Sequence, residues 1–123
     1  MSQQRGAPRP MRVAQMIQEE VSRLLLRGLK DPRLGGLITV TGAKISPDLK
    51  EAVVYYSVFG DEAQRKATQQ GLEAASTYLK REVAHNLKLR YAPHLRFVFD
   101  ESIERGDRIE QLLREAKQKE SGE

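Results

Sequence analysis

The chain has 123 residues, a length that suits one domain, and carries 21 Lys and Arg residues against 17 Asp and Glu. Because it contains no cysteine, a disulfide framework and a thiolate metal site are excluded. No window approaches the roughly 18 apolar residues of a membrane-spanning helix, and no signal-peptide core is present. We therefore expect a cytoplasmic protein with no membrane partner.

Charge is distributed unevenly along the chain, although its net value is only +4. No acidic residue precedes Glu19, whereas the segment from Asp100 to Glu123 holds eight acids against five bases. This asymmetry predicts one surface that meets a polyanion and an acidic end that avoids it.

A basic arm and a helix are expected at the start of the chain. Residues 1–10 are rich in Gln, Pro, Gly and Arg, a composition that buries too little apolar surface to become ordered. Apolar residues then recur at helical spacing from Met11 to about Leu29. The spacing predicts an amphipathic helix, which Gly28 and the following Asp31-Pro32 pair end.

The next segment predicts a β-hairpin. Residues 37–45 have the composition of a strand, but their inward side changes parity, so we expect a bulge near Gly42. Residues 46–49 form a turn sequence that contains a proline, and the Val- and Tyr-rich residues 52–59 are typical of a second strand. The two strands should pair in antiparallel fashion.

A long helical pattern follows this hairpin. Asp61 and Gln64 resemble a capping box, and helical spacing continues towards Leu87. The adjacent hydroxyl residues Ser76 and Thr77 can bond local backbone, so they predict a kink or a junction between two helical segments. The alternative is one continuous helix with two solvent-facing hydroxyls.

The end of the chain predicts one more strand and one more helix. Beyond Pro93, alternating residues indicate a third strand over 95–100, and Ser102 caps a short amphipathic helix. Residues 117–123 form a polar tail, so the domain spans residues 11–116. The element order is α-β-β-α-α-β with a trailing helix, which predicts an α+β fold with helices covering a three-stranded sheet.

Two long segments in this order resemble the ribosome-binding factor A family. They are the residues that end the opening helix and form the hairpin, LKDPRLGGLITVTGAKISPDLKEAVVYYSVFGD, and the later EAASTYLKREVAHNLKLRYAPHLRFVFDES. The resemblance covers almost the whole chain and implies a type II KH-like fold. The family carries a helix-kink-helix with an Ala-x-Gly sequence in place of the KH glycine loop, and this kink aligns with Ala75, Ser76 and Thr77.

Thr77 stands where the family has the glycine of that kink. Threonine does not adopt a positive φ angle as cheaply as glycine does, so the local geometry departs from the family pattern, although Ser76 can still cap a second segment. No two glycines are spaced as G-x-x-G. A KH clamp on four single-stranded nucleotides is therefore not expected.

Cations in the later segment and one near the start are the candidate RNA-binding residues. They suit the phosphates of structured RNA and position a nucleic acid more than they read its sequence. A solvated face with no partner is the alternative interpretation. The candidates are Arg12, Lys80, Arg81, Lys88, Arg90 and Arg96.

Catalytic and cofactor chemistry find little support in the sequence. No nucleophile stands beside a base, and no phosphate cradle or cluster of metal ligands is present, so we expect no enzyme activity, cofactor or metal. The two histidines, His85 and His94, fit surface or partly packed positions. The strand aromatics are expected in the core rather than on a stacking platform. They are Tyr55, Tyr56, Phe59, Phe97 and Phe99.

The resemblance implies a non-catalytic ribosome assembly factor. Such a protein binds the immature free small (30S) ribosomal subunit, assists maturation and 5′-end processing of 16S rRNA, and matters for growth in the cold. We expect it to act as a monomer with the small subunit and its rRNA as partners and without a small-molecule substrate. A general KH-like protein acting on mRNA, or a protein-interaction module using the apolar residues of the last helix, are the alternatives.

Overall fold

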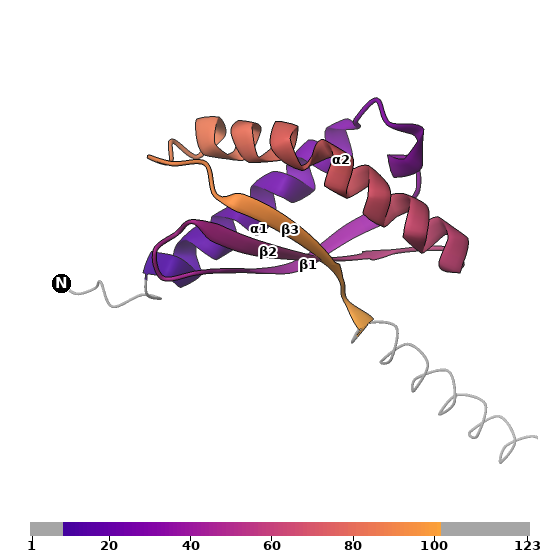
Figure 1. Ribbon diagram of the computed structural model, residues 1–123, viewed down its shortest axis with the longest axis horizontal. Helices are drawn as coiled ribbons and strands as arrows, with labels where there is room; N and C mark the ends of the chain where they lie inside the picture. Colours follow the sequence, from indigo (N-terminus) through magenta and orange to yellow (C-terminus); the bar gives the residue numbers. More distant parts are fainter. Residues whose placement is uncertain (1–8, 102–123) are drawn as a thin grey trace, which may run out of the picture.

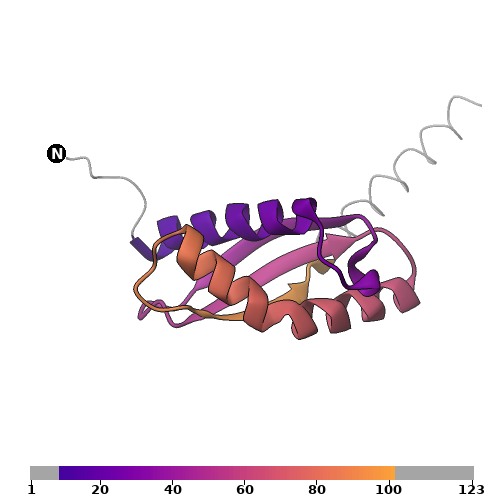
Figure 2. The same cartoon turned by 90° about the horizontal axis from the view of Figure 1, so that it is seen from above.

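The computed structural model describes residues 9–101. Figures 1 and 2 show two helices lying across a three-stranded sheet. The core is contributed by one side of the sheet and by both helices, so the helices cover the same face. The elements are α1 (Arg9–Arg27), the 3-10 helix η2 (Pro32–Leu34), β1 (Ile38–Ile45), β2 (Glu51–Val58), α2 (Glu62–Asn86) and β3 (His94–Phe99).

The sheet has the order β1-β2-β3, with β1 antiparallel and β3 parallel to β2. Val40 pairs with Tyr56 and Gly42 with Tyr55, so Thr41 has no partner on β2 and forms the bulge. Its hydroxyl instead donates a hydrogen bond of 2.7 Å to Asp100 Oδ2. The predicted hairpin and the bulge near Gly42 are confirmed.

The α+β class and the three-stranded sheet are also confirmed, and the arrangement agrees with a type II KH-like fold. α1 begins at Arg9, two residues before the predicted start and inside the segment assigned to the arm. Pro10 is compatible with this position because amide groups in the first turn have no helical partner. The predicted helix from Ser102 and the tail at 117–123 lie outside the described residues.

The core lies between the sheet and the two helices. Alternate residues of β2 point into it, and they pack against apolar residues from α1, α2 and β3. Tyr56 and Phe97 are buried as expected, but the side chain of Phe59 is 83% exposed. The expectation for Phe59 was wrong because it follows the last residue of β2 and has the opposite parity to the inward Val58.

One continuous helix replaces the two predicted segments between Glu62 and Asn86. Asp61 caps it as predicted, because its Oδ1 accepts a 2.9 Å hydrogen bond from the amide of Gln64. The prediction of a junction between two helices therefore needs correction: α2 changes direction near its middle, but as a bend within one helix (Figures 1 and 2).

Ser76 does not cap a second segment. Its hydroxyl donates a 2.8 Å hydrogen bond to the carbonyl oxygen of Glu73, one turn earlier in α2. Such a bond from a serine to the preceding turn often accompanies a bent helix. Thr77 is helical and exposed, so this position requires no glycine.

Candidate nucleic-acid interface

The six candidate cations do not share one helix face. Lys80 and Arg81 lie on α2, whereas Lys88 and Arg90 follow its end and belong to the loop before β3. The candidates therefore do not form one basic helical face, because α2 ends at Asn86 and Lys88 and Arg90 lie beyond it.

The end of α2 is a Schellman motif. The amide of Leu89 donates to the carbonyl of Ala84 at 2.9 Å, and the amide of Lys88 donates to that of His85 at 3.3 Å. This arrangement requires a left-handed residue just past the helix, a place usually taken by glycine. Here Lys88 adopts it, with φ of 56°.

Three segments meet at the end of the molecule where α1 begins (Figures 1 and 2). A cavity of about 190 Å³ there is lined by residues of the α1 start, the β1–β2 turn and the α2–β3 loop, which brings Arg9 and Arg90 to one site. The Arg90 guanidinium lies 5.8 Å from the ring centre of Tyr91, which is 66% exposed. We call Arg9, Arg12, Lys88, Arg90 and Tyr91 the basic end.

Asp48 is the acidic residue that lines this cavity. Its Oδ1 accepts hydrogen bonds from the Ser46 hydroxyl at 2.6 Å and from the Lys50 amide at 3.0 Å. The Ser46 bond and then the Lys50 amide lower the pKa of Asp48 below its usual value, so this carboxylate is ionised at neutral pH. The Asp48 carboxylate therefore stabilises the β1–β2 turn. In the same turn the Leu49 amide donates a 2.9 Å hydrogen bond to the Ser46 carbonyl.

Arg96 lies apart from the basic end, on the edge strand β3. It is exposed between the inward residues Leu95 and Phe97, and it helps to line a groove of about 320 Å³ between α2 and β3. Gln69 joins the two walls, because its Nε2 donates a 2.8 Å hydrogen bond to the carbonyl of Phe97. Glu73 also lines this groove, so its charge is mixed.

Within the described residues, no acidic side chain forms a salt bridge with a candidate cation. Within residues 9–101 the salt bridges join Arg23 to Glu20 and Arg33 to Asp31, and none involves a candidate cation. Arg12, Arg81, Lys88, Arg90 and Arg96 are exposed and Lys80 is partly exposed. Their charge is therefore available to an external anion.

Tyr91 is a residue of this surface that the sequence did not single out as an RNA contact, and Arg9 lies in a helix rather than in the expected flexible basic arm. Arg9 was assigned to the arm, and Tyr91 follows a cation in a loop without any periodic pattern. The weak sequence signal for Tyr91 is its place directly after Arg90 and two residues before Pro93. In the described part of the chain, no three His, Asp or Glu side chains gather where they could hold a metal ion.

Neither of the helices described between residues 9 and 101 is long and apolar enough to cross a membrane.

The family model for ribosome-binding factor A matches residues 9–113. The chain belongs to the ribosome-binding factor A family. The family name describes a ribosome-binding protein. This is the same family that the two long sequence segments resemble.

Relatives with that description are similar over most of their length. Ribosome-binding factor A from Anaeromyxobacter sp. (strain Fw109-5) is 58% identical over 113 residues, covering 92% of this chain and 93% of the relative. The protein from Anaeromyxobacter dehalogenans (strain 2CP-C) is 63% identical over 109 residues, covering 89% and 79%.

Solved structures of the family share the fold. The crystal structure of ribosome-binding factor A from Thermus thermophilus has a TM-score of 0.61 at 26% identity, covering 72% of this chain and 93% of that one. A solution structure of a putative family member from Thermotoga maritima has a TM-score of 0.58 at 34% identity, covering 76% and 91%. A third match, at TM-score 0.54 and 27% identity, is a Thermus thermophilus homology model fitted into a cryo-EM map of a 30S complex, covering 70% and 93%.

Proposed function

We propose that this protein binds the immature free 30S ribosomal subunit and assists maturation of 16S rRNA, including processing at its 5′ end. It does so in the cytoplasm as a monomer, without catalysing a reaction. Family membership supports the ribosomal partner, and a structural relative was fitted into the map of a 30S complex. The observation that carries the proposal to these residues is a set of exposed or partly exposed cations that form no salt bridge within residues 9–101.

The mechanism is electrostatic docking on structured RNA. The basic end contacts phosphates with side chains from α1 and the α2–β3 loop, and Lys80 and Arg81 extend the contact along α2. Phosphate contacts fix orientation and register rather than sequence. The protein thus holds a maturing region of rRNA in a productive arrangement until later assembly displaces it, which matters most in the cold.

The contact set can be tested by co-sedimentation with purified immature 30S subunits. A variant with Lys80, Arg81, Lys88 and Arg90 changed to Gln should lose binding and keep its circular dichroism spectrum. The variant Lys66→Gln is a control, because this residue is exposed and lies outside the proposed surface. Binding that survives the fourfold change would shift the contact face from α2 and the α2–β3 loop to α1, which carries Arg12, Arg23 and Arg27.

Salt dependence distinguishes phosphate contacts from a protein-interaction surface. The logarithm of the binding constant should fall linearly with the logarithm of salt concentration, with a slope of about −0.7 to −0.9 per neutralised phosphate. A flat response would exclude the electrostatic mechanism. Crosslinking in cells should recover small-subunit rRNA, and mainly mRNA would instead support a general RNA-binding role.

A further inference from the structure

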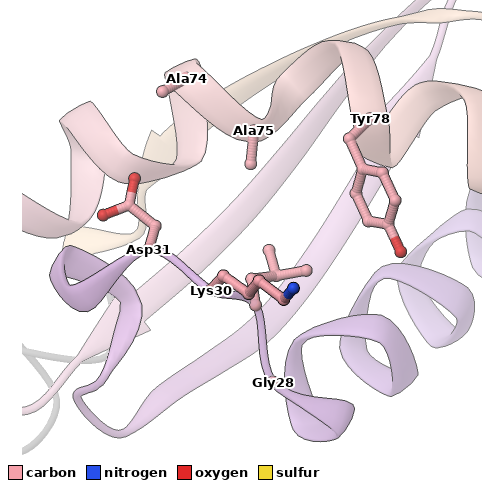
Figure 3. A pocket seen from close by; sticks show the side chains of 7 residues that line it. Gly28, Lys30, Asp31, Ala74, Ala75 and Tyr78 are labelled. Atoms are coloured by element: carbon pink, nitrogen blue, oxygen red, sulfur yellow. The ribbon is translucent and has the colours of Figure 1, made fainter.

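A second recess lies on the side of α2 that faces α1 and η2. It has a volume of about 440 Å³ and is formed by three residues of α2 and by the segment that joins α1 to η2. Figure 3 shows the side chains that line it: Gly28, Leu29, Lys30, Asp31, Ala74, Ala75 and Tyr78. None of them lines the groove between α2 and β3, so this recess is a separate site.

Small residues keep the recess open. Ala74 and Ala75 present only methyl groups where α2 passes the joining segment, and Ala75 points into the space between them (Figure 3). Gly28 has φ of 92° and ends α1, and a Cβ atom added to it would meet nothing within 4 Å. The recess is therefore not filled by the chain that surrounds it.

The aromatic side chain of Tyr78 forms one side of the recess. Its ring projects from α2 towards α1 in Figure 3, and the residue is 41% exposed, although the neighbouring Leu79 is fully buried. An aromatic ring held on a helix at the mouth of an apolar recess leaves one face able to stack on a flat partner.

The charges around the recess favour a polyanion. Lys30 lines it, and Arg81 lies three residues beyond Tyr78 on α2, a spacing that places the two on adjoining positions of the helix surface. Asp31 is the acidic residue of the lining, and both of its carboxylate oxygens accept hydrogen bonds from the Arg33 guanidinium. That ion pair neutralises Asp31. Glu82 lies four residues beyond Tyr78 on α2, so Lys30 and Arg81 stand against one further acid near the recess.

We propose that this recess receives one unpaired nucleobase of the bound RNA, stacked on Tyr78, with the flanking phosphates at Lys30 and Arg81. The inference rests on the proposed RNA binding and adds a nucleotide-specific contact to it. An unstacked base offers the flat apolar faces that the ring and the two alanines fit, and its backbone supplies the charge that the two cations complement.

Three RNA hairpins that differ at one position test this site: one with a single-nucleotide bulge, one with an abasic residue in the bulge, and one fully paired. The protein should bind the bulged hairpin on the order of tenfold more tightly than the abasic hairpin, because base–aromatic stacking has about that effect. Tyr78→Ala should abolish this preference, and Tyr78→Phe should retain it. Tyr91→Ala should also retain it, because that ring lies at the basic end.

Ala75→Leu provides a second route to the same result, because its added carbons enter the recess. This variant should no longer prefer the bulged hairpin. Its affinity for the paired hairpin, which depends on phosphate contacts, should be unchanged. Equal affinity of the unmodified protein for the bulged and abasic hairpins would overturn the base site while leaving RNA binding intact. If the protein binds neither the 30S subunit nor any of the three hairpins, the proposed function itself is overturned.

Discussion

The side-chain amide of Asn86 donates a 2.7 Å hydrogen bond to Oε2 of Glu20, and so joins the last residue of α2 to the middle of α1. Glu20 is only 9% exposed, and its carboxylate also forms a bidentate ion pair with Arg23. The hydrogen bond from Arg23, and after it the bond from Asn86, hold the pKa of Glu20 below its ordinary value against the opposing effect of burial.

Glu20→Gln should therefore lower the free energy of unfolding at pH 7 by about 1.5–3 kcal/mol, the range for hydrogen bonds to a charged group. Urea denaturation measures this value, and Glu19→Gln is the matched control because Glu19 is exposed on the same helix. A double-mutant cycle with Asn86→Ala isolates the bond between the helices. A coupling energy of zero would show that the two side chains act independently.

The contribution of Glu20 should also depend on pH. A carboxylate whose pKa is lowered by folding adds stability above its unfolded pKa, about 4.3, and loses this contribution as pH falls through the folded pKa. The difference in unfolding free energy between the unmodified protein and Glu20→Gln should thus be constant from pH 7 to about 5 and shrink below that. A difference that grows on acidification would contradict the assigned ion pair.

Gln69 connects α2 to two strands. Its Nε2 donates to the Phe97 carbonyl at 2.8 Å and to Glu73 Oε2 at 2.9 Å, while the Tyr56 hydroxyl donates to its Oε1. Burial raises the pKa of Tyr56, so this hydroxyl remains a donor at neutral pH. Gln69→Glu replaces the amide donor with a second acceptor, and should cost about 2–3 kcal/mol of unfolding free energy at pH 7.

The same variant should recover part of that loss on mild acidification, because a protonated Glu side chain at position 69 can again donate to the carbonyl. Folding raises the pKa of such a carboxyl, so its penalty is present at high pH and is relieved as pH falls through the raised value. Gln70→Glu, on the exposed neighbouring position, should show neither effect. Thermal unfolding at pH 7 and pH 5 compares the two variants.

Gly60 and Gly28 both have positive φ angles but should respond differently to alanine. At Gly60, φ is 142° and an added Cβ would lie 2.8 Å from two carbons of Gln64, whereas at Gly28 φ is 92° and the space is open. Both substitutions incur backbone strain of about 1–3 kcal/mol, and Gly60→Ala adds a steric clash. Urea titration should show a clearly larger loss of stability for Gly60→Ala, and equal losses would mean that Gln64 moves aside at no cost.

Local features of this fold were predictable from sequence, because the residues that create them are neighbours. The bulge near Gly42 follows from a change of parity, and the cap at Asp61 follows from spacing to Gln64. The parallel pairing of β2 with β3 and the meeting of Arg9 with Arg90 depend on contacts between distant segments. Sequence periodicity contains no information about such contacts.

The end of α2 shows a different limit. Periodicity continued towards Leu87, and no glycine or proline stands directly after it to signal the Schellman motif that places Lys88 and Arg90 in a loop. The end of α2 lies within one residue of the predicted position, but a lysine in the left-handed position does not signal the motif that follows it. The kink expected in this helix is present as a bend, but within one continuous helix rather than at a junction between two.

This lysine leads to a prediction in which stability and binding change in opposite directions. Lys88 has φ of 56°, a conformation that costs a non-glycine residue free energy. Lys88→Gly should raise the free energy of unfolding by about 0.5–1 kcal/mol and weaken 30S binding, with the magnitude of the salt slope reduced by about one. Denaturant titration and co-sedimentation at several salt concentrations measure the two effects on the same protein.

Arg90→Gln is the matched control for Lys88→Gly, because it removes a charge from the same loop at a position that has no positive φ. It should weaken 30S binding without a gain in stability. Lys88→Asn separates the two roles further, since asparagine tolerates the left-handed conformation and carries no charge. If Lys88→Gly is more stable and binds the subunit as tightly as the unmodified protein, the lysine makes no phosphate contact, and RNA binding does not explain why a strained lysine occupies this position.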